Sequence, residues 1–151
     1  MSFQDLNTTK LGNIGERYVA EFANSKNSVP YIPALEGSAP VDSLMIKRDN
    51  YRVWSCEVKT KGRLTYYEKT GYDLNDHQSY CSMPFPVYIL FVDHITQSIY
   101  GAWVKDLDKD SSKEIMKDKL AIFSLTAMTE HRKLEVIEVE ELVKASNSNY
   151  I

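Results

Sequence analysis

Residues 86–92, Pro86-Val87-Tyr88-Ile89-Leu90-Phe91-Val92, form a nearly continuous apolar run. Such a run predicts a central β-strand covered on both faces, because a strand with one face in water alternates apolar and polar residues. Residues Ser98 to Val104 follow as the expected hairpin partner of this strand. A strand buried on both sides needs a layer on each side, so the run favours helices flanking a sheet.

Upstream of this strand, the sequence predicts a helix and then a hairpin. The helix is expected from Lys10 to Ala23, because apolar residues recur there at helical spacing, namely Leu11, Ile14, Tyr18, Val19 and Phe22. Residues 24–40 are rich in proline and predict an irregular segment. Two strands, Val41 to Ile46 and Tyr51 to Thr60, are joined by turn residues at 47–50.

The other elements are predicted from weaker patterns. We expect a third short strand over Leu64 to Tyr67 and a helix over Asp73 to Ser82, entered through Gly71. The remaining expected elements are a charged loop with a short helix over 105–118, an edge strand over 120–125 and a terminal helix over 139–145. The resulting α-β-β-β-α-β order predicts an α/β fold, a mixed β-sheet flanked by helices.

Length and composition bound the class of protein. With 151 residues, 43% hydrophobic and 26% charged, the chain suits a single domain, with a core over about 10–105 and a C-terminal appendage over about 106–151. No apolar run is long enough to span a bilayer, and the N-terminus has no basic start followed by an apolar stretch. We therefore expect no membrane association and a cytoplasmic location.

Cysteine and histidine usage argues against a zinc centre. Cys56 and Cys81 lie too far apart for a CxxC motif, so both are expected to be reduced. The three histidines, His77, His94 and His131, show no ligand spacing and no pairing with a cysteine in the sequence. The chain also lacks a phosphate-binding glycine loop, so no small-molecule organic cofactor is expected.

The charge is unevenly distributed. Eighteen basic and 21 acidic residues give a net charge of −3, which argues against a broad basic coating for nucleic acid. Up to Tyr72 there are ten basic and eight acidic residues, or +2, leaving eight and thirteen, or −5, for the rest. Residues that could stack bases and contact phosphates gather near the end of the first part: Lys61, Arg63, Tyr66, Tyr67, Lys69 and Tyr72. The alternative is an ordinary tyrosine-rich strand surface.

The triplet Glu57-Val58-Lys59 is the main candidate for chemistry. It is the only acid-x-lysine triplet in the chain, and residues two apart on a strand share one face, roughly 6.5–7 Å apart. Asp42 begins the neighbouring strand, so two carboxylates are expected on adjacent strands. Two oxygen ligands with open positions suit Mg²⁺, with Mn²⁺ as a substitute, and Lys59 could act on the attacking water. The alternatives are a surface ion pair on an edge strand for Glu57 and Lys59, and a polar loop residue for Asp42.

These residues resemble a known family. Pro40-Val41-Asp42, fourteen intervening residues and Glu57-Val58-Lys59, behind a helix carrying Gly15-Glu16-Arg17, look like the PD-(D/E)xK nuclease superfamily. Within it, the chain is similar to archaeal-type Holliday-junction resolvases and their phage and bacterial relatives. The resemblance covers about residues 10–105 and implies a restriction-endonuclease-like core.

The resemblance also implies roles for individual residues. Asp42 and Glu57 would hold Mg²⁺, Glu16 would complete the metal site from the first helix, and Lys59 would position or activate the water. Gln78 is similar in placement to a glutamine that several branches use near the site. For Glu16 the alternative is a solvated helix glutamate, and for Gln78 an ordinary polar helix residue.

Taken together, the sequence predicts a Mg²⁺-dependent DNA endonuclease, resolvase-like, that acts on branched or duplex DNA. It is expected to act either as a small homodimer or as a part of a larger DNA-processing system. Its catalytic residues would be Asp42, Glu57, Lys59 and Gln78. One alternative is a nuclease-like fold that binds DNA or protein without cutting. Another is an interaction protein whose acidic C-terminal half binds a basic partner.

Overall fold

The computed structural model describes residues 8–31, 44–60, 68–93 and 96–134. Within these residues, the elements in chain order are α1 (Thr8–Ser25), β1 (Ser28–Tyr31), β2 (Leu44–Lys47), β3 (Val53–Thr60), β4 (Lys69–Asp73), α2 (Leu74–Cys81), β5 (Val87–Asp93), β6 (Ser98–Trp103), α3 (Val104–Lys109), β7 (Glu114–Met116), β8 (Leu120–Ser124), a short 3₁₀ helix (Leu125–Ala127) and β9 (Thr129–Lys133). The expected strand over 64–67 and the expected helix over 139–145 lie outside the described residues.

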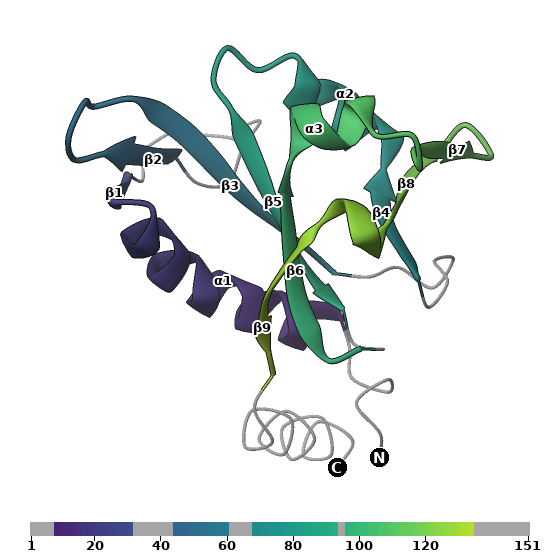
Figure 1. The fold of residues 1–151 in the computed structure, drawn as a ribbon, viewed down its shortest axis with the longest axis horizontal. Coiled ribbons are helices and arrows are strands. Elements are labelled where there is room, and N and C mark those ends of the chain that lie inside the picture. The colour runs from purple at the N-terminus through teal and green to yellow at the C-terminus, as the bar shows by residue number, and fades with distance from the viewer. Residues whose placement is uncertain (1–7, 32–43, 61–67, 94–95, 135–151) are drawn as a thin grey trace.

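The main sheet has six strands in the order β1-β2-β3-β5-β6-β9 (Figure 1). Among the strands that the structure describes in this sheet, only β3 and β5 pair in parallel, and every other neighbouring pair is antiparallel. The sheet is therefore mixed, as the sequence predicts, and the two expected hairpins, β2 with β3 and β5 with β6, are confirmed. The order of elements differs from the expected one, because β1 precedes the hairpin.

Strand β5 is buried along its whole length. Tyr88, Leu90 and Val92 pack in the cluster that contains Phe22 of α1. The intervening residues Val87, Ile89 and Phe91 belong to a second cluster, which is formed with α2, α3 and β8. The prediction of a strand covered on both faces is thus confirmed. Figure 1 shows α1 on one side of the main sheet, with α2 and α3 away from α1.

The segment expected to be irregular contains a strand. Residues 28–31 form β1 at the edge of the sheet, although this strand includes Pro30. Proline lacks an N–H, and an edge position tolerates it because one side of the strand has no ladder to complete. The prolines in residues 24–40 predicted an irregular segment, but four of these residues form a short edge strand.

A second, three-stranded sheet follows the order β4-β8-β7. Gly71 belongs to β4 and not to a helix entry, because it pairs with Ile122 of β8. A Cβ at this position would lie 2.2 Å from the Ala121 carbonyl oxygen. Only glycine allows this close approach. The strand expected at an edge over 120–125 is in fact β8, the central strand of this sheet.

The segment after residue 105, expected as an appendage, contributes strands to both sheets. Strand β8 pairs with β4, and β9 pairs with β6 at the edge of the main sheet. In the described part of the chain, no helix is both long and apolar enough to cross a membrane. Cys56 and Cys81 are free thiols, in agreement with the expectation of reduced cysteines, and burial raises the pKa of Cys56 to about 12.

Candidate functional site

Strand β3 presents Glu57 and Lys59 on one face of the main sheet. Trp54 and Cys56, at alternating positions, pack with α1 on the opposite face. Glu57 pairs in register with Ile89 of β5, and Lys59 with Phe91, so both side chains project toward the layer that contains α2. The two-residue spacing therefore brings a carboxylate and an ammonium to the same side of an interior strand.

Glu57 is a buried acidic residue. Only 1% of it is exposed, and its Oε1 accepts a hydrogen bond from the Ser55 hydroxyl at 3.2 Å. Taking a carboxylate out of water is costly unless the site compensates for its charge. The buried Glu57 carboxylate therefore needs hydrogen bonds or a positive charge around it.

Lys59 is held by α2. Its Nζ donates a hydrogen bond to Asp76 Oδ2 at 2.8 Å and lies 5.5 Å from the centre of the Tyr80 ring. Burial by itself lowers the pKa of Lys59, but the Asp76 hydrogen bond and the neighbouring Tyr80 outweigh it, so the pKa is raised. Lys59 therefore carries an ammonium and can act as a cation and hydrogen-bond donor.

The alternative of a surface ion pair on an edge strand is wrong. Strand β3 lies between β2 and β5, Glu57 is buried, and Lys59 forms its ion pair with Asp76. Sequence reasoning missed Asp76 and Tyr80. Their spacing of four residues within the expected helix over 73–82 places them on one helix face, but which strand this face meets depends on tertiary packing.

The other expected site residues are placed differently. Gln78 is exposed on α2, about 200° around the helix from Asp76. Lys69 of β4 forms an ion pair with Glu114 of β7, and its Nζ lies 3.2 Å from each carboxylate oxygen. The structure does not bring Gln78 or Lys69 into contact with Lys59 through any described interaction, and their roles stay predictions.

Several expected site residues cannot be placed. Asp42, Lys61, Arg63 and Tyr67 lie outside the described residues. Glu16 lies within α1, but its side chain is outside the described part of the structure. The structure therefore assembles Glu57 and Lys59 and leaves the predicted roles of these five residues untested.

Two expectations about ring side chains are corrected. Tyr72, expected among the base-stacking residues, is only 5% exposed, and its hydroxyl contacts His77 Nδ1 in the interior. His77, expected to have no cysteine partner, has its Nε2 3.6 Å from Cys81 Sγ. Positions 77 and 81 are one helical turn apart, and this spacing was the signal in the sequence.

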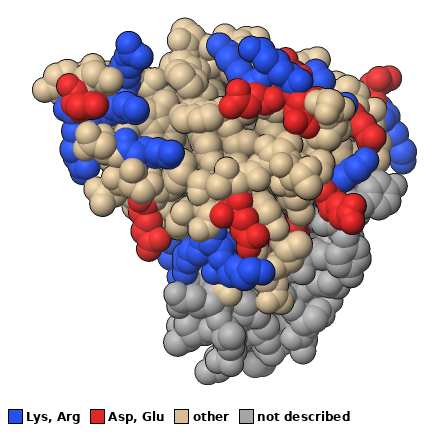
Figure 2. Space-filling model, viewed as in Figure 1, with Lys and Arg blue, Asp and Glu red and all other residues tan. Residues whose placement is uncertain are grey.

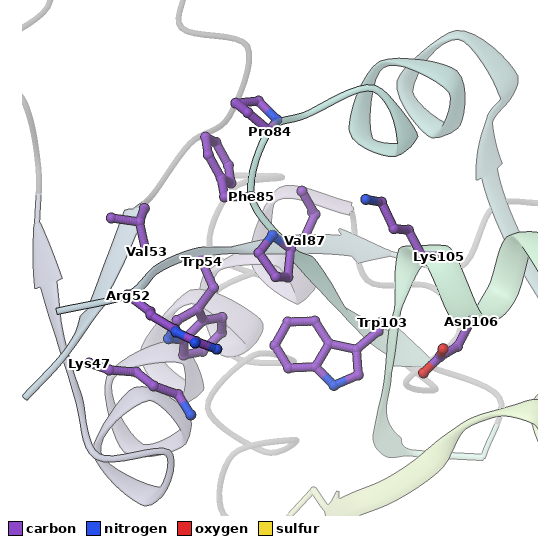
Figure 3. A pocket seen from close by; sticks show the side chains of 11 residues that line it. Lys47, Arg52, Val53, Trp54, Pro84, Phe85, Val87, Trp103, Lys105 and Asp106 are labelled. Atoms are coloured by element: carbon purple, nitrogen blue, oxygen red, sulfur yellow. The ribbon is translucent and has the colours of Figure 1, made fainter. Parts of the chain in front are cut away.

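A separate pocket of about 710 Å³ lies at the start of β3 and β5 (Figure 3). The half-buried indole of Trp103 stands in its wall, with the basic side chains of Lys47 and Arg52 on one side and Lys105 on the other. Trp103 packs edge-on against Trp54, with ring centres 5.7 Å apart. The pocket lies about five residues, or about 16 Å along β3, from Lys59, so it is distinct from the Glu57 site.

The surface charge is mixed. On the face shown in Figure 2, basic side chains form separate groups beside acidic ones, with an uncharged area between them. The net charge of −3 likewise gives no reason to expect a broad basic surface. Contacts with a polyanion would therefore be local.

Comparison with solved structures identifies a similar fold. The chain is similar to Archaeoglobus fulgidus Hjc, a Holliday junction resolvase from an archaeal hyperthermophile, with a TM-score of 0.52 and 12% sequence identity. The match covers 79% of this chain and 90% of that chain. No protein-family model matches the sequence, and no curated protein matches it.

The likeness is one of fold. It supports a nuclease-like α/β architecture, a mixed sheet with flanking helices, and agrees with the fold expected from the sequence. At 12% identity it does not transfer the activity of Hjc to this chain.

Proposed function

We propose that this protein is a metal-dependent DNA endonuclease, resolvase-like, that hydrolyses phosphodiester bonds. The observation that carries the proposal is that the buried Glu57 carboxylate and the Lys59 ammonium share one face of an interior strand. The nuclease-like fold shared with an archaeal resolvase supports it.

The donor atoms near Glu57 suit a hard divalent cation. Its carboxylate and the Ser55 hydroxyl lie 3.2 Å apart and supply oxygen only, which is the chemistry Mg²⁺ prefers. In the proposal, Glu57 and Asp42 hold Mg²⁺ with Glu16 completing the site, and Mn²⁺ can replace it. When bound, the ion supplies positive charge to the scissile phosphate and makes a water more acidic.

Lys59 has its own part in the proposed reaction. As an ammonium, it donates a hydrogen bond to a phosphate oxygen and stabilises the negative charge that develops in the transition state. Asp76 and Tyr80 hold the Lys59 side chain in place from α2. A group that is already oriented before the substrate arrives loses little entropy when it acts.

The proposed substrate is branched or duplex DNA, and the proposed assembly is a homodimer. A core of this size offers one Glu57–Lys59 site, which cuts one strand. Two copies would therefore be needed to cut both strands of a duplex or a pair of strands in a junction.

The first test is a nicking assay. We expect the protein to cut supercoiled or branched DNA when Mg²⁺ or Mn²⁺ is present and to leave it intact when a chelator removes the metal. Single-stranded DNA is included as a third substrate. Protein that binds these DNAs but cuts none of them with either metal would instead be a binding module, and protein that neither binds nor cuts would favour the interaction-protein alternative.

The pocket at Trp103 supports a nucleic-acid substrate by a separate route. An unpaired base can stack on the indole while Lys47, Arg52 or Lys105 contacts the flanking phosphates. These residues were not among those expected to contact DNA. Base-stacking on an aromatic ring contributes about 1–3 kcal/mol per base, so the pocket would favour branched or single-stranded DNA over a plain duplex.

We expect Trp103→Leu to weaken binding of DNA with unpaired bases by about tenfold, with little change for duplex DNA, since leucine keeps apolar volume but cannot stack. Trp103→Phe should keep most of the wild-type affinity, because phenylalanine can still stack.

Arg52→Ala should lower the salt dependence of DNA binding by the amount expected for the loss of about one phosphate contact. Lys109→Ala, a change outside the pocket lining, should leave the salt dependence unchanged. Fluorescence anisotropy at several salt concentrations measures both effects, and equal affinities for wild type and Trp103→Leu would remove the pocket from the DNA interface.

A further inference from the structure

Three side chains with metal-ligating atoms meet between α2 and α3. His77 and Cys81 lie one turn apart on α2, and Asp108 comes from α3. His77 Nε2 is 2.9 Å from Asp108 Oδ1 and 3.6 Å from Cys81 Sγ, and the three ligand atoms all lie within 4.8 Å of one another. This group does not include Glu57 or Lys59.

The His77 ring is fixed in one orientation. Only 2% of the residue is exposed, its Nδ1 contacts the Tyr72 hydroxyl, and the ring packs against Phe123 with centres 5.3 Å apart. These contacts turn Nε2 toward Cys81 and Asp108. Histidines that bind metals are held in this way, with the second ring nitrogen bonded to a neighbouring group.

The separations between the ligand atoms can be compared with those of a tetrahedral centre. Metal–ligand lengths of about 2.3 Å to sulfur and about 2.0–2.1 Å to nitrogen or oxygen separate a nitrogen and a sulfur ligand by about 3.6 Å, and a nitrogen and an oxygen ligand by about 3.3 Å. The nitrogen–sulfur separation of 3.6 Å equals the first value, whereas the nitrogen–oxygen separation of 2.9 Å is that of a hydrogen bond and is shorter than the second. For a cation to enter, Asp108 Oδ1 would have to move away from His77 Nε2 by about 0.4 Å.

We propose that His77, Cys81 and Asp108 form a zinc site that joins α2 to α3. A set of one nitrogen, one sulfur and one oxygen suits Zn²⁺, a borderline-soft ion, and differs from the oxygen ligands of a magnesium site. Three protein ligands leave the fourth position to a water molecule. The proposal does not depend on the nuclease function.

Binding of the ion requires a defined movement of protons. The Cys81 thiol gives its proton to solvent and binds as the thiolate. Nε2 of His77 loses to solvent the proton that it donates to Asp108, and Nδ1 takes up a proton from solvent, so the neutral ring changes tautomer with no net loss of a proton. Nε2 then offers its lone pair to the metal, and Nδ1–H donates to the Tyr72 oxygen, whose own O–H turns away. Asp108 exchanges its hydrogen bond with His77 for a bond to the ion, while Lys113 Nζ, 3.0 Å from Asp108 Oδ1, stays as its neighbour.

The site would fix the helix that holds Lys59. Asp76 and Tyr80, which contact Lys59, lie on the same short helix as His77 and Cys81. Helix α2 has eight residues, and a helix of this length gains most of its stability from tertiary contacts. A metal bridge to α3 would add one such contact.

The test uses Co²⁺ as a probe in full-length, metal-free protein kept reduced with a phosphine. We expect one equivalent of Co²⁺ to give a thiolate-to-metal charge-transfer band with the visible bands of a tetrahedral ion, and Zn²⁺ to displace it. Cys81→Ser should lose the charge-transfer band, and Asp108→Asn should weaken binding by at least about tenfold. Asp106→Asn, an exposed change two positions earlier on α3, is the matched control and should bind normally.

Thermal unfolding provides a second readout. Zn²⁺ at about a hundredfold excess over Kd should raise the Tm of the wild type by about 5 °C or more, and should raise that of Cys81→Ser much less. Circular dichroism without metal shows whether each variant is folded. A charge-transfer band that persists in Cys81→Ser, or an equal rise in Tm for this variant, would overturn the proposal. So would wild-type protein that gives no thiolate band.

Discussion

Replacing Glu57 by glutamine should reduce metal-dependent cleavage by about a thousandfold or more, while the fold is retained. The substitution keeps the size of the side chain and an oxygen acceptor for Ser55, but removes the negative charge proposed to hold Mg²⁺. Loss of several kcal/mol of transition-state stabilisation corresponds to this change in rate. Affinity for DNA should stay equal or increase slightly, because a negative charge near the phosphates has been removed.

The comparison is a nicking assay with wild type, Glu57→Gln and Glu21→Gln at matched purity, with folding checked by circular dichroism. Glu21 is exposed on α1, and this helix packs on the opposite face of the sheet, so its variant should cut like the wild type. Anisotropy of labelled DNA reports binding separately. Cleavage that is unchanged in Glu57→Gln would mean that a contaminant or another site cuts the DNA.

The parts of the fold that could be predicted are those set by local patterns. The apolar run at 86–92 specifies a doubly covered strand, and the helical stripe near Tyr18 and Phe22 specifies α1. The hairpin of β2 and β3 follows from two strand-forming segments joined by a short turn. In each case neighbours in the sequence are neighbours in the structure.

Elements that depend on distant partners were missed. Strand β9 is largely polar, with no residue buried, and it exists because it pairs with β6. Gly71 of β4 pairs with Ile122 of β8, about fifty residues later, and the sequence around it suggested a helix entry. Such pairings depend on contacts between residues that are far apart in the sequence, and a pattern of neighbouring residues does not show these contacts.

The same division holds for the candidate site. The spacing of Glu57 and Lys59 is local and placed both side chains on one face correctly. Asp76 reaches Lys59 from another element, 17 residues later, and only packing of α2 against the sheet reveals this contact. His77 and Cys81 had a visible helical spacing, but Asp108, 31 residues after His77, makes the group a candidate metal site.

Strand β5 offers a test of the architecture itself, because its two faces pack on different layers. Leu90 packs with α1, and Phe91 packs with the layer of α2, α3 and β8, where its ring lies 5.8 Å from that of Tyr72. Both residues are 0% exposed. We expect Leu90→Ala to lower the free energy of unfolding by about 2–5 kcal/mol and Phe91→Ala by about 3–5 kcal/mol, because each leaves a cavity in a closed core.

Urea unfolding with linear extrapolation measures both changes, and Val29→Ala is the control. Val29 lies on the edge strand β1 and is 44% exposed, so its truncation should cost less than about 1 kcal/mol. A strand with one face in water would show a large loss for only one of the two β5 variants. Equal and large losses require a layer on each side of β5, the strand that pairs with β3 and its residues Glu57 and Lys59. If the free energy of unfolding fell by less than about 1 kcal/mol in Leu90→Ala, α1 would not cover this face of the sheet. The same result for Phe91→Ala would mean that the layer containing α2 does not pack on the other face.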